Sequence, residues 1–295
     1  MELSDLKVFQ AIAEEASISG AAKRLDYVQS NVTARLRKLE EELGVVLFRR
    51  TVKGMTITEK GQLFRRYADS ILQMADEAVM AVQEQDQPGG TLRIGVVETV
   101  TCGNFMNLLA AYQAQNEQVS LRLETGNPLQ LMEKVKNYEL DGALVTGDIP
   151  KTAFILDYVQ TDEVVLLSGK AIDFGNTRNA EEAMEISALS AIKWAVSQEG
   201  CPFRSRLARW LKDEQAALTN FIEISSLETL LSSVKEGLAC TLLPKSVLSG
   251  SYEHLHVTPV PAPYTFIETG LIRRQDKYVS RAYKAFAELV REQGL

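Results

Sequence analysis

Residues 17–61, SISGAAKRLDYVQSNVTARLRKLEEELGVVLFRRTVKGMTITEKG, decide the fold of the N-terminal region. Apolar residues recur at three- and four-residue steps over 20–26 and again over 30–44, which predicts two helices joined by a short turn, with Ser19 as an N-cap and Gly44 as a C-cap. The stretches 45–50 and 55–58 read as short strands. A further amphipathic helix is expected over 3–15. Three helices followed by a two-stranded ribbon are typical of a winged helix-turn-helix.

The chemistry of this region favours a nucleic-acid partner. A winged helix-turn-helix places the N-terminal residues of its second motif helix in the major groove, where Gln and Asn can pair with adenine and Arg with guanine. Residues 23–66 carry 11 Lys and Arg against 5 Asp and Glu, although the whole chain has a net charge of −7. A small helical subdomain with solvated polar faces is the alternative. The residues expected to contact duplex DNA are Ser19, Gln29, Ser30, Asn31, Thr33, Arg35, Lys38, Arg50 and Lys53.

Residues 17–61 resemble the DNA-binding domain of LysR-type transcriptional regulators. Val28 stands where the family pattern usually has Ser, and Ser30 and Asn31 stand where it often has Pro-Ala. Some of the base contacts are therefore expected to be specific to this chain. The matching residues are the alanine pair 21–22, Gln29, Val32-Thr33, Leu39-Glu40, the LG-x-x-LF-x-R run 43–50 and the T-x-x-G of 58–61.

A long helix is predicted over 59–87, starting from Thr58 as N-cap. Its apolar residues recur at coiled-coil spacing, and a single stripe of this length needs a partner. Packing on the chain's own second domain is one interpretation; the family resemblance implies instead that two subunits pair through Phe64, Ile71, Ala75 and Val82. The stretch QDQPGGT, 85–91, is the clearest linker.

After residue 91 the pattern changes to alternating strands and helices, which predicts a parallel α/β sheet with right-handed crossovers. This region resembles, more loosely, the effector-binding part of the same family, two α/β subdomains related to periplasmic binding proteins. We expect a DNA-binding domain at 1–58, a linker helix at 59–87, subdomain I at 91–161 with 267–295, and subdomain II at 162–266.

A ligand site is expected off the carboxyl ends of these strands, where helix N-termini favour anions. The resemblance implies a small inducer between the subdomains, which we expect to be anionic. Capping of helices by Thr and Ser is the alternative for each residue alone. The candidate effector contacts are Thr99, Thr101, Cys102, Asn127, Thr146, Ser197 and Cys201.

Other function classes find little support in the 295 residues. We recognise no nucleotide-binding or nucleophile-elbow motif, and the two histidines and three cysteines lack metal-ligand spacing, so we expect no enzyme activity, cofactor or metal. We also expect no membrane segment and a cytoplasmic location. The expected partners are duplex DNA, a small effector and further copies of the chain as a dimer or tetramer, with RNA polymerase as an additional candidate.

Two other interpretations remain. The first is a redox sensor on the same scaffold, since Cys201 precedes a predicted helix, the environment that lowers the pKa of a thiol. The second is a metabolite-binding or enzymatic α/β protein whose N-terminal helices only mediate oligomerisation. Loss of the response in a Cys201→Ser protein distinguishes the redox sensor from the metabolite-responsive regulator.

Overall fold

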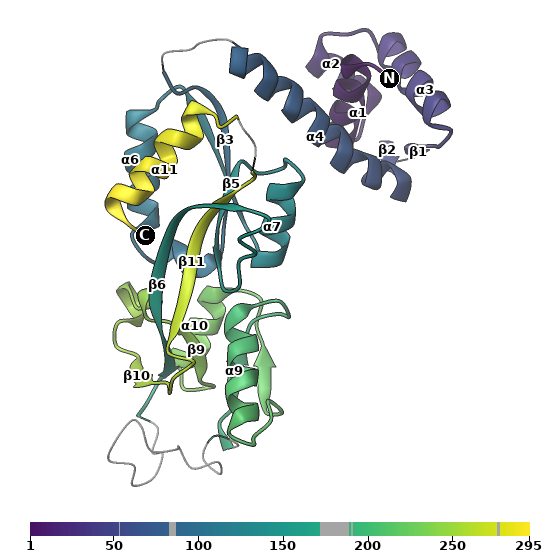
Figure 1. The fold of residues 1–295 in the computed structure, drawn as a ribbon. Helices are drawn as coiled ribbons and strands as arrows, with labels where there is room; N and C mark the ends of the chain where they lie inside the picture. The colour runs from purple at the N-terminus through teal and green to yellow at the C-terminus, as the bar shows by residue number, and fades with distance from the viewer. Residues whose placement is uncertain (53, 83–86, 172–188, 190, 276–277) are drawn as a thin grey trace. The chain divides into compact units, whose positions relative to one another are not determined.

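The computed structural model describes residues 1–52, 54–82, 87–171, 189, 191–275 and 278–295. The chain divides into two compact units, and each is described by itself (Figure 1). The first comprises Met1–Asp86 with Lys136–Glu139, and the second comprises Gln87–Val135 with Leu140–Leu295. None of the described helices is long and apolar enough to span a membrane. The stretch AEEAME, 180–185, for which the sequence favours a helix, lies outside the described residues.

The first unit is a winged helix-turn-helix followed by a long helix, as predicted. One N-cap differs from the prediction: the Ser17 hydroxyl, not Ser19, accepts the N–H of Gly20, so the second helix begins two residues earlier. Gly44 ends the third helix in the left-handed region, at φ 67°. The elements are α1 (Leu3–Glu15), α2 (Ile18–Leu25), α3 (Gln29–Leu43), β1 (Phe48–Thr51), β2 (Gly54–Ile57) and α4 (Glu59–Val82).

A compact aromatic core holds these elements together. The ring of Phe9 on α1 lies 5.1 Å from that of Phe48 on β1 and 5.0 Å from that of Phe64 on α4. Ala21 and Ala22 are both buried, which lets α2 approach its neighbours closely. The winged helix therefore packs against the start of α4, and Phe64 belongs to this core.

The family-like residues around the ribbon have direct structural roles. The Glu40 carboxylate accepts the backbone N–H groups of Leu47 and Phe48, at 2.6 and 3.2 Å, and so positions the start of β1. Thr58 caps α4 by accepting the N–H of Gly61. A Cβ at Gly61 would lie 2.3 Å from the Leu47 carbonyl oxygen, so only glycine fits.

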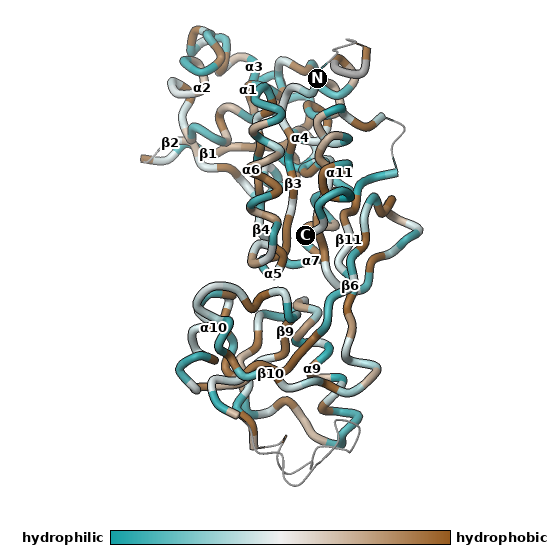
Figure 2. The backbone as a smooth tube through the Cα atoms, turned by 90° about the vertical axis from the view of Figure 1, so that its left-hand side faces the viewer, coloured by the Kyte–Doolittle hydropathy of each residue, from teal (hydrophilic) through white to brown (hydrophobic). Residues whose placement is uncertain are grey.

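The second unit begins with an α/β layer around a central sheet. Strands β3 (Gly90–Val96), β4 (Val119–Thr125) and β5 (Gly142–Thr146) are parallel, with β3 in the middle. Helices α6 (Phe105–Gln115) and α11 (Arg281–Gln293) lie side by side on one face (Figure 1), where Tyr112 packs edge-on against Phe286. Helix α7 (Pro128–Lys136) packs with a separate apolar cluster that includes buried residues of β5. Apolar and hydrophilic residues alternate along the helices that cover this sheet (Figure 2).

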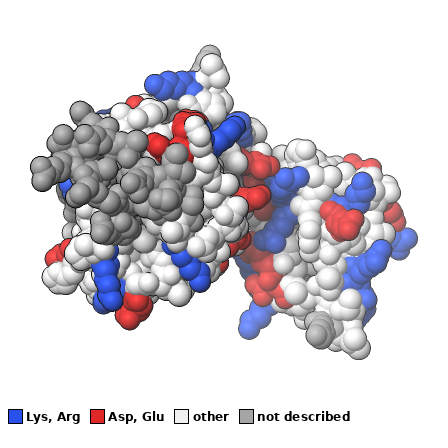
Figure 3. Space-filling model, turned by 90° about the horizontal axis from the view of Figure 1, so that it is seen from below, with Lys and Arg blue, Asp and Glu red and all other residues white. Residues whose placement is uncertain are grey.

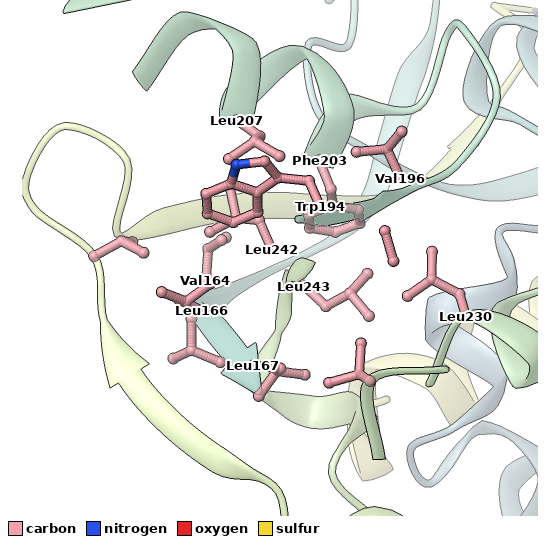
Figure 4. Packing of buried hydrophobic residues seen from close by; sticks show 14 of the residues in the cluster. Val164, Leu166, Leu167, Trp194, Val196, Phe203, Leu207, Leu230, Leu242 and Leu243 are labelled. Atoms are coloured by element: carbon pink, nitrogen blue, oxygen red, sulfur yellow. The ribbon is translucent and has the colours of Figure 1, made fainter. Parts of the chain in front are cut away.

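A second layer forms around another apolar cluster. Trp194 and Trp210 are both buried, and their rings meet edge-on at 6.4 Å. Figure 4 shows Trp194 packed among side chains of α9 and β9, including Leu207 and Leu242. The elements here are β7 (Trp194–Val196), α9 (Pro202–Asp213), β8 (Phe221–Glu223), α10 (Leu227–Lys235), β9 (Thr241–Pro244) and β10 (His256–Pro259). His256, one of the two histidines, begins β10.

Two long strands join the layers. β6 (Ile155–Ser168) pairs antiparallel with β11 (Phe266–Arg273) through its first part and with β9 and β10 through its last part. β11 also pairs antiparallel with β5. The predicted parallel pairing is confirmed for β3, β4 and β5. It does not extend to β6 and β11: the chain crosses between the layers twice, out along β6 and back along β11, and these strands, which lead in opposite directions, pair antiparallel.

Candidate functional site

The N-terminal end of α3 presents polar side chains to solvent. Gln29, Ser30 and Thr33 are exposed, and Asn31 is half-buried. No side chain caps α3, so its first amides remain available to an anion such as a phosphate. Ser19 is also exposed and shares a hydrogen bond with Ser17. This end of α3 has the chemistry required for base and phosphate contacts.

Arg35 is half-buried and Lys38 is exposed, and both pair with acidic residues at the start of α1. The Arg35 guanidinium donates to Asp5 Oδ1 at 2.7 Å and to the Ser4 hydroxyl at 2.8 Å. Lys38 Nζ lies 2.9 Å from Glu2 Oε1. Asp5 is fully buried, and a buried carboxylate needs a charged partner. This geometry argues against the predicted base contact of Arg35, because the side chain already holds α3 to α1.

The wing carries one clear candidate for a phosphate contact. Arg50 is exposed on β1, opposite Met55 in the ladder. The predicted contact Lys53 lies outside the described residues. Gly54, at φ 120°, follows the turn, and a Cβ there would lie 2.5 Å from the Ala16 carbonyl oxygen, so the wing returns close to the end of α1. Acidic and basic side chains are interspersed among the described residues on the surface drawn in Figure 3.

Helix α4 buries part of the stripe that was predicted for dimerisation. Phe64 packs on Phe9, and Ile71 is half-buried against the winged-helix core. Val82 is exposed, as predicted for a contact surface, and Ala75 is half-buried. The large apolar side chains of α4 that remain exposed are Leu63, Tyr67, Met74, Val79 and Val82. Phe64 is half-buried against the winged helix, so less of it is available for a contact with a second copy.

The second unit contains a cleft of about 230 Å³ at the ends of strands β3, β4, β5 and β7, as expected for a ligand site in an α/β sheet. Five of the seven predicted effector contacts line it: Thr99, Asn127, Thr146, Ser197 and Cys201. Further lining residues are Val97, Glu98, Thr125, Gly126, Pro128, Gln130, Gln198, Glu199, Pro202, Phe203, Ser225, Leu227 and Leu243.

Thr101 and Cys102 do not line the cleft. A short helix, α5 (Glu98–Thr101), follows β3, and the Thr101 hydroxyl donates to the Glu98 carbonyl at 2.7 Å. One helical turn therefore carries these side chains past the strand end, while Thr99 stays at the cleft. Burial is the main cause of the raised pKa of the Cys102 thiol, which disfavours the reactive thiolate.

Several polar groups of the cleft already have partners. The Thr146 and Thr269 hydroxyls share a buried hydrogen bond of 2.7 Å. Asn127 Oδ1 accepts the N–H of Gln130 and so caps α7. Glu98 Oε2 accepts the N–H of Leu227, at the start of α10, at 3.0 Å. The last bond links the two layers across the cleft.

The start of α9 differs from these sites because it has no side-chain cap. Cys201 is the N-cap residue, Pro202 has no N–H, and no side chain accepts from the first turn. Arg204 is in this turn, but its guanidinium donates to the Ser197 carbonyl at 3.0 Å and to the Glu223 carboxylate at 2.5 Å. The amides of the first turn of α9 are therefore suited to an anionic group of a ligand.

The chain matches two family models. The model of the bacterial regulatory helix-turn-helix protein, lysR family, covers residues 3–62, and the model of the LysR substrate binding domain covers residues 85–295. The HTH-type transcriptional regulator CzcR of Bacillus anthracis is 38% identical over 295 residues, which is 99% of this chain and 98% of the relative. The HTH-type transcriptional regulator SoxR of Arthrobacter sp. (strain TE1826) is 36% identical over 293 residues, with 99% and 97% covered.

Solved structures support the same fold. Full-length CbnR complexed with its target DNA has a TM-score of 0.69 at 20% identity and covers 99% of each chain. A full-length OxyR variant from Pseudomonas aeruginosa also has a TM-score of 0.69, at 23% identity, covering 99% of this chain and 95% of that one.

Proposed function

Because the chain belongs to the LysR family of bacterial regulatory helix-turn-helix proteins, and is thus a LysR-type DNA-binding transcriptional regulator, we propose that a small polar metabolite bound in its cleft controls that regulation. The protein acts in the cytoplasm as a homo-oligomer on duplex DNA. RNA polymerase is a further candidate partner. The observation that carries the proposal is the joint presence of an exposed, uncapped recognition-helix start and a polar cleft at the strand ends.

The DNA contacts are assigned to two elements. Gln29 and Ser30 at the start of α3 read base edges and adjacent phosphates, and Asn31 and Thr33 add contacts on the same side. Arg50 on the wing binds a phosphate outside the major groove. Arg35 is excluded from this set because Asp5 and Ser4 hold its guanidinium.

Oligomerisation is assigned to the exposed side of α4. Large apolar side chains that stay exposed at helical spacing on a long helix are stabilised when a second copy covers them. Tyr67 is 62% exposed and Met74 46% exposed, and we place them at the centre of this contact.

The cleft ligand is a small molecule with an anionic group. The uncapped start of α9 and the hydroxyls of Thr99 and Ser197 supply hydrogen-bond donors to that group. The cleft volume of about 230 Å³ suits a small metabolite.

Two threonines of one helix test the ligand site. The protein-free small-molecule fraction of a bacterial cell extract is added to the full chain, and the shift in thermal unfolding midpoint is measured. Thr99→Val should need about ten- to a hundredfold more concentrated extract than the parent for the same shift in midpoint. The reason is that a lost hydrogen bond to a buried anion costs roughly 1–3 kcal/mol. Thr101→Val is the matched control and should respond like the parent. Loss of the response in Thr101→Val but not in Thr99→Val would contradict the assignment.

A further inference from the structure

The charges that line the cleft are both negative. Among the described lining residues, the charged side chains are Glu98 and Glu199, and neither a lysine nor an arginine is present. A ligand that carried only anionic groups would meet two carboxylates and no side-chain cation. Its favourable partners would be limited to backbone amides and hydroxyls. The lining thus calls for a ligand with a positive group in addition to the anionic one.

The two glutamates differ in their partners. Glu98 already accepts the Leu227 N–H at the start of α10, which demonstrates that a helix start in this cleft takes a carboxylate. Glu199 is exposed and lies two residues before the N-cap of α9. Glu228, next to the cleft on α10, accepts from the Tyr252 hydroxyl at 2.6 Å, and Arg204 is held by Glu223. Glu199 is therefore the carboxylate in position to bind a cationic group.

The uncapped start of α9, to which we assign the anionic group of the ligand, follows Glu199 by two residues in the chain. Helix α9 is 12 residues long and uncapped, and its Cys201, Pro202 and Phe203 line the cleft. The turn that carries Glu199 leads straight into the free amides of α9. A ligand whose ammonium and carboxylate groups are attached to the same carbon matches this pair of neighbouring subsites.

We infer that the cleft binds a free α-amino acid, with the carboxylate on the first-turn amides of α9 and the ammonium on Glu199. The inference rests on the proposed function, because it names the ligand class of the same cleft. The uncharged polar groups of Thr125, Gln130 and Ser225 line the rest of the volume and face the amino-acid side chain.

The test uses the full chain and the twenty proteinogenic amino acids, each assayed by calorimetric titration. We expect at least one to bind, and the tightest binder is then compared with the carboxylic acid that lacks its amino group and with the amine that lacks its carboxyl group. Both analogues should bind at least tenfold more weakly. A deaminated acid that binds as tightly as the amino acid, or a panel in which none of the twenty binds, overturns the inference.

Variants separate this inference from the proposed function. Glu199→Gln should weaken binding of the amino acid at least tenfold and leave binding of the deaminated acid unchanged or stronger. Glu117→Gln, an exposed glutamate of the same unit that does not line the cleft, is the matched control. Unchanged amino-acid binding in Glu199→Gln contradicts the inference. If the small-molecule extract still stabilises the parent but not Thr99→Val, the proposed function stands while the amino-acid assignment falls; if the extract stabilises neither, the proposed function falls too.

Discussion

Arg35 lies on the recognition helix, yet its guanidinium contacts α1. Asp5 accepts from Arg35 at 2.7 Å and from the backbone N–H of Glu2 at 2.9 Å, so this buried carboxylate joins the start of α1 to the middle of α3. An arginine near the start of a recognition helix favours a base contact by residue type alone. Only the fold reveals that a buried acid 30 residues earlier competes for it. Arg35 therefore positions the helix that reads DNA.

Replacing Arg35 should act on stability and not on base preference. Arg35→Ala leaves Asp5 buried without its cation, which should destabilise the winged helix by about 1–3 kcal/mol. Hydrogen exchange of the α3 amides measures this as a roughly ten- to hundredfold loss of protection. The ranking of operator variants by affinity should stay the same, because the base contacts are unchanged.

Gln29→Ala provides the contrast for Arg35→Ala. It should keep the α3 protection and change the ranking of operator variants, since a bidentate base contact carries about 1–3 kcal/mol of discrimination. A changed ranking together with unchanged protection in Arg35→Ala would return Arg35 to the base contacts.

Helix α4 is a single element with apolar side chains on two different sides. Its apolar periodicity indicates a buried stripe, but periodicity does not say which partner covers which part. Phe64, Ala68 and Leu72 are buried or half-buried within the winged-helix cluster, while Tyr67 and Met74 stay exposed on another side. We therefore propose a contact between copies on a different side of the helix from the predicted stripe.

Met74→Asp should therefore convert the oligomer into smaller species without unfolding the winged helix. The added charge lies at an exposed apolar position and opposes burial against a second copy. Gln62→Asp adds the same charge about 120° around the helix and is the control. Sedimentation velocity measures the assembly; an unchanged sedimentation coefficient for Met74→Asp would assign the interface to another surface.

The wing is expected to bind phosphate and carry little sequence information. Arg50→Ala should weaken binding to all duplexes and reduce the slope of log K against log salt by about 1 unit. Arg122→Ala, an exposed arginine of the second unit, should leave the slope unchanged. Equal slopes for Arg50→Ala and the parent would remove the wing from the phosphate contacts.

The link between α1 and α3 should also depend on pH. Hydrogen bonds from Lys38 and Arg35 lower the pKa of Glu2 from 4.5 to about 2. A carboxyl with a lowered folded-state pKa stabilises the fold above its unfolded pKa, and this stabilisation is lost as the pH falls toward the folded value. The stability difference between the parent and Glu2→Gln, measured by urea unfolding, should be constant above about pH 5 and should shrink between pH 4.5 and 2. A difference that stays constant down to pH 3 would contradict this role of Glu2.

Across the whole chain, local sequence patterns predict the helices and strands better than they predict which strands pair with one another. The winged helix could be predicted because its signals are local: the alanine pair, the Gly44 cap and the T-x-x-G that Gly61 completes. The antiparallel pairing of β6 with β11 could not, because those strands lie about a hundred residues apart and periodicity does not define pairing.

The sequence predicts the strand ends at which the candidate cleft lies, but not every side chain that lines it. Thr99 lines it and Thr101 does not, since the extra turn of α5 was not visible in the pattern. Glu199 belongs to a turn that was expected near the site, but its charge gains meaning only when the cleft is found to lack a basic side chain among its described lining residues. Which side chains from distant segments meet in one cleft can therefore be determined only from the folded structure.

Selection of bound sequences from a random duplex pool measures whether this chain binds DNA with sequence specificity. The full chain should enrich a motif with dyad symmetry whose half-sites lie one helical turn, or a multiple of it, apart, because two copies present two α3 helices. The small-molecule fraction of a cell extract should change the affinity for this motif. If the chain remains folded but no sequence is enriched after repeated rounds, the chain is not a sequence-specific DNA-binding protein.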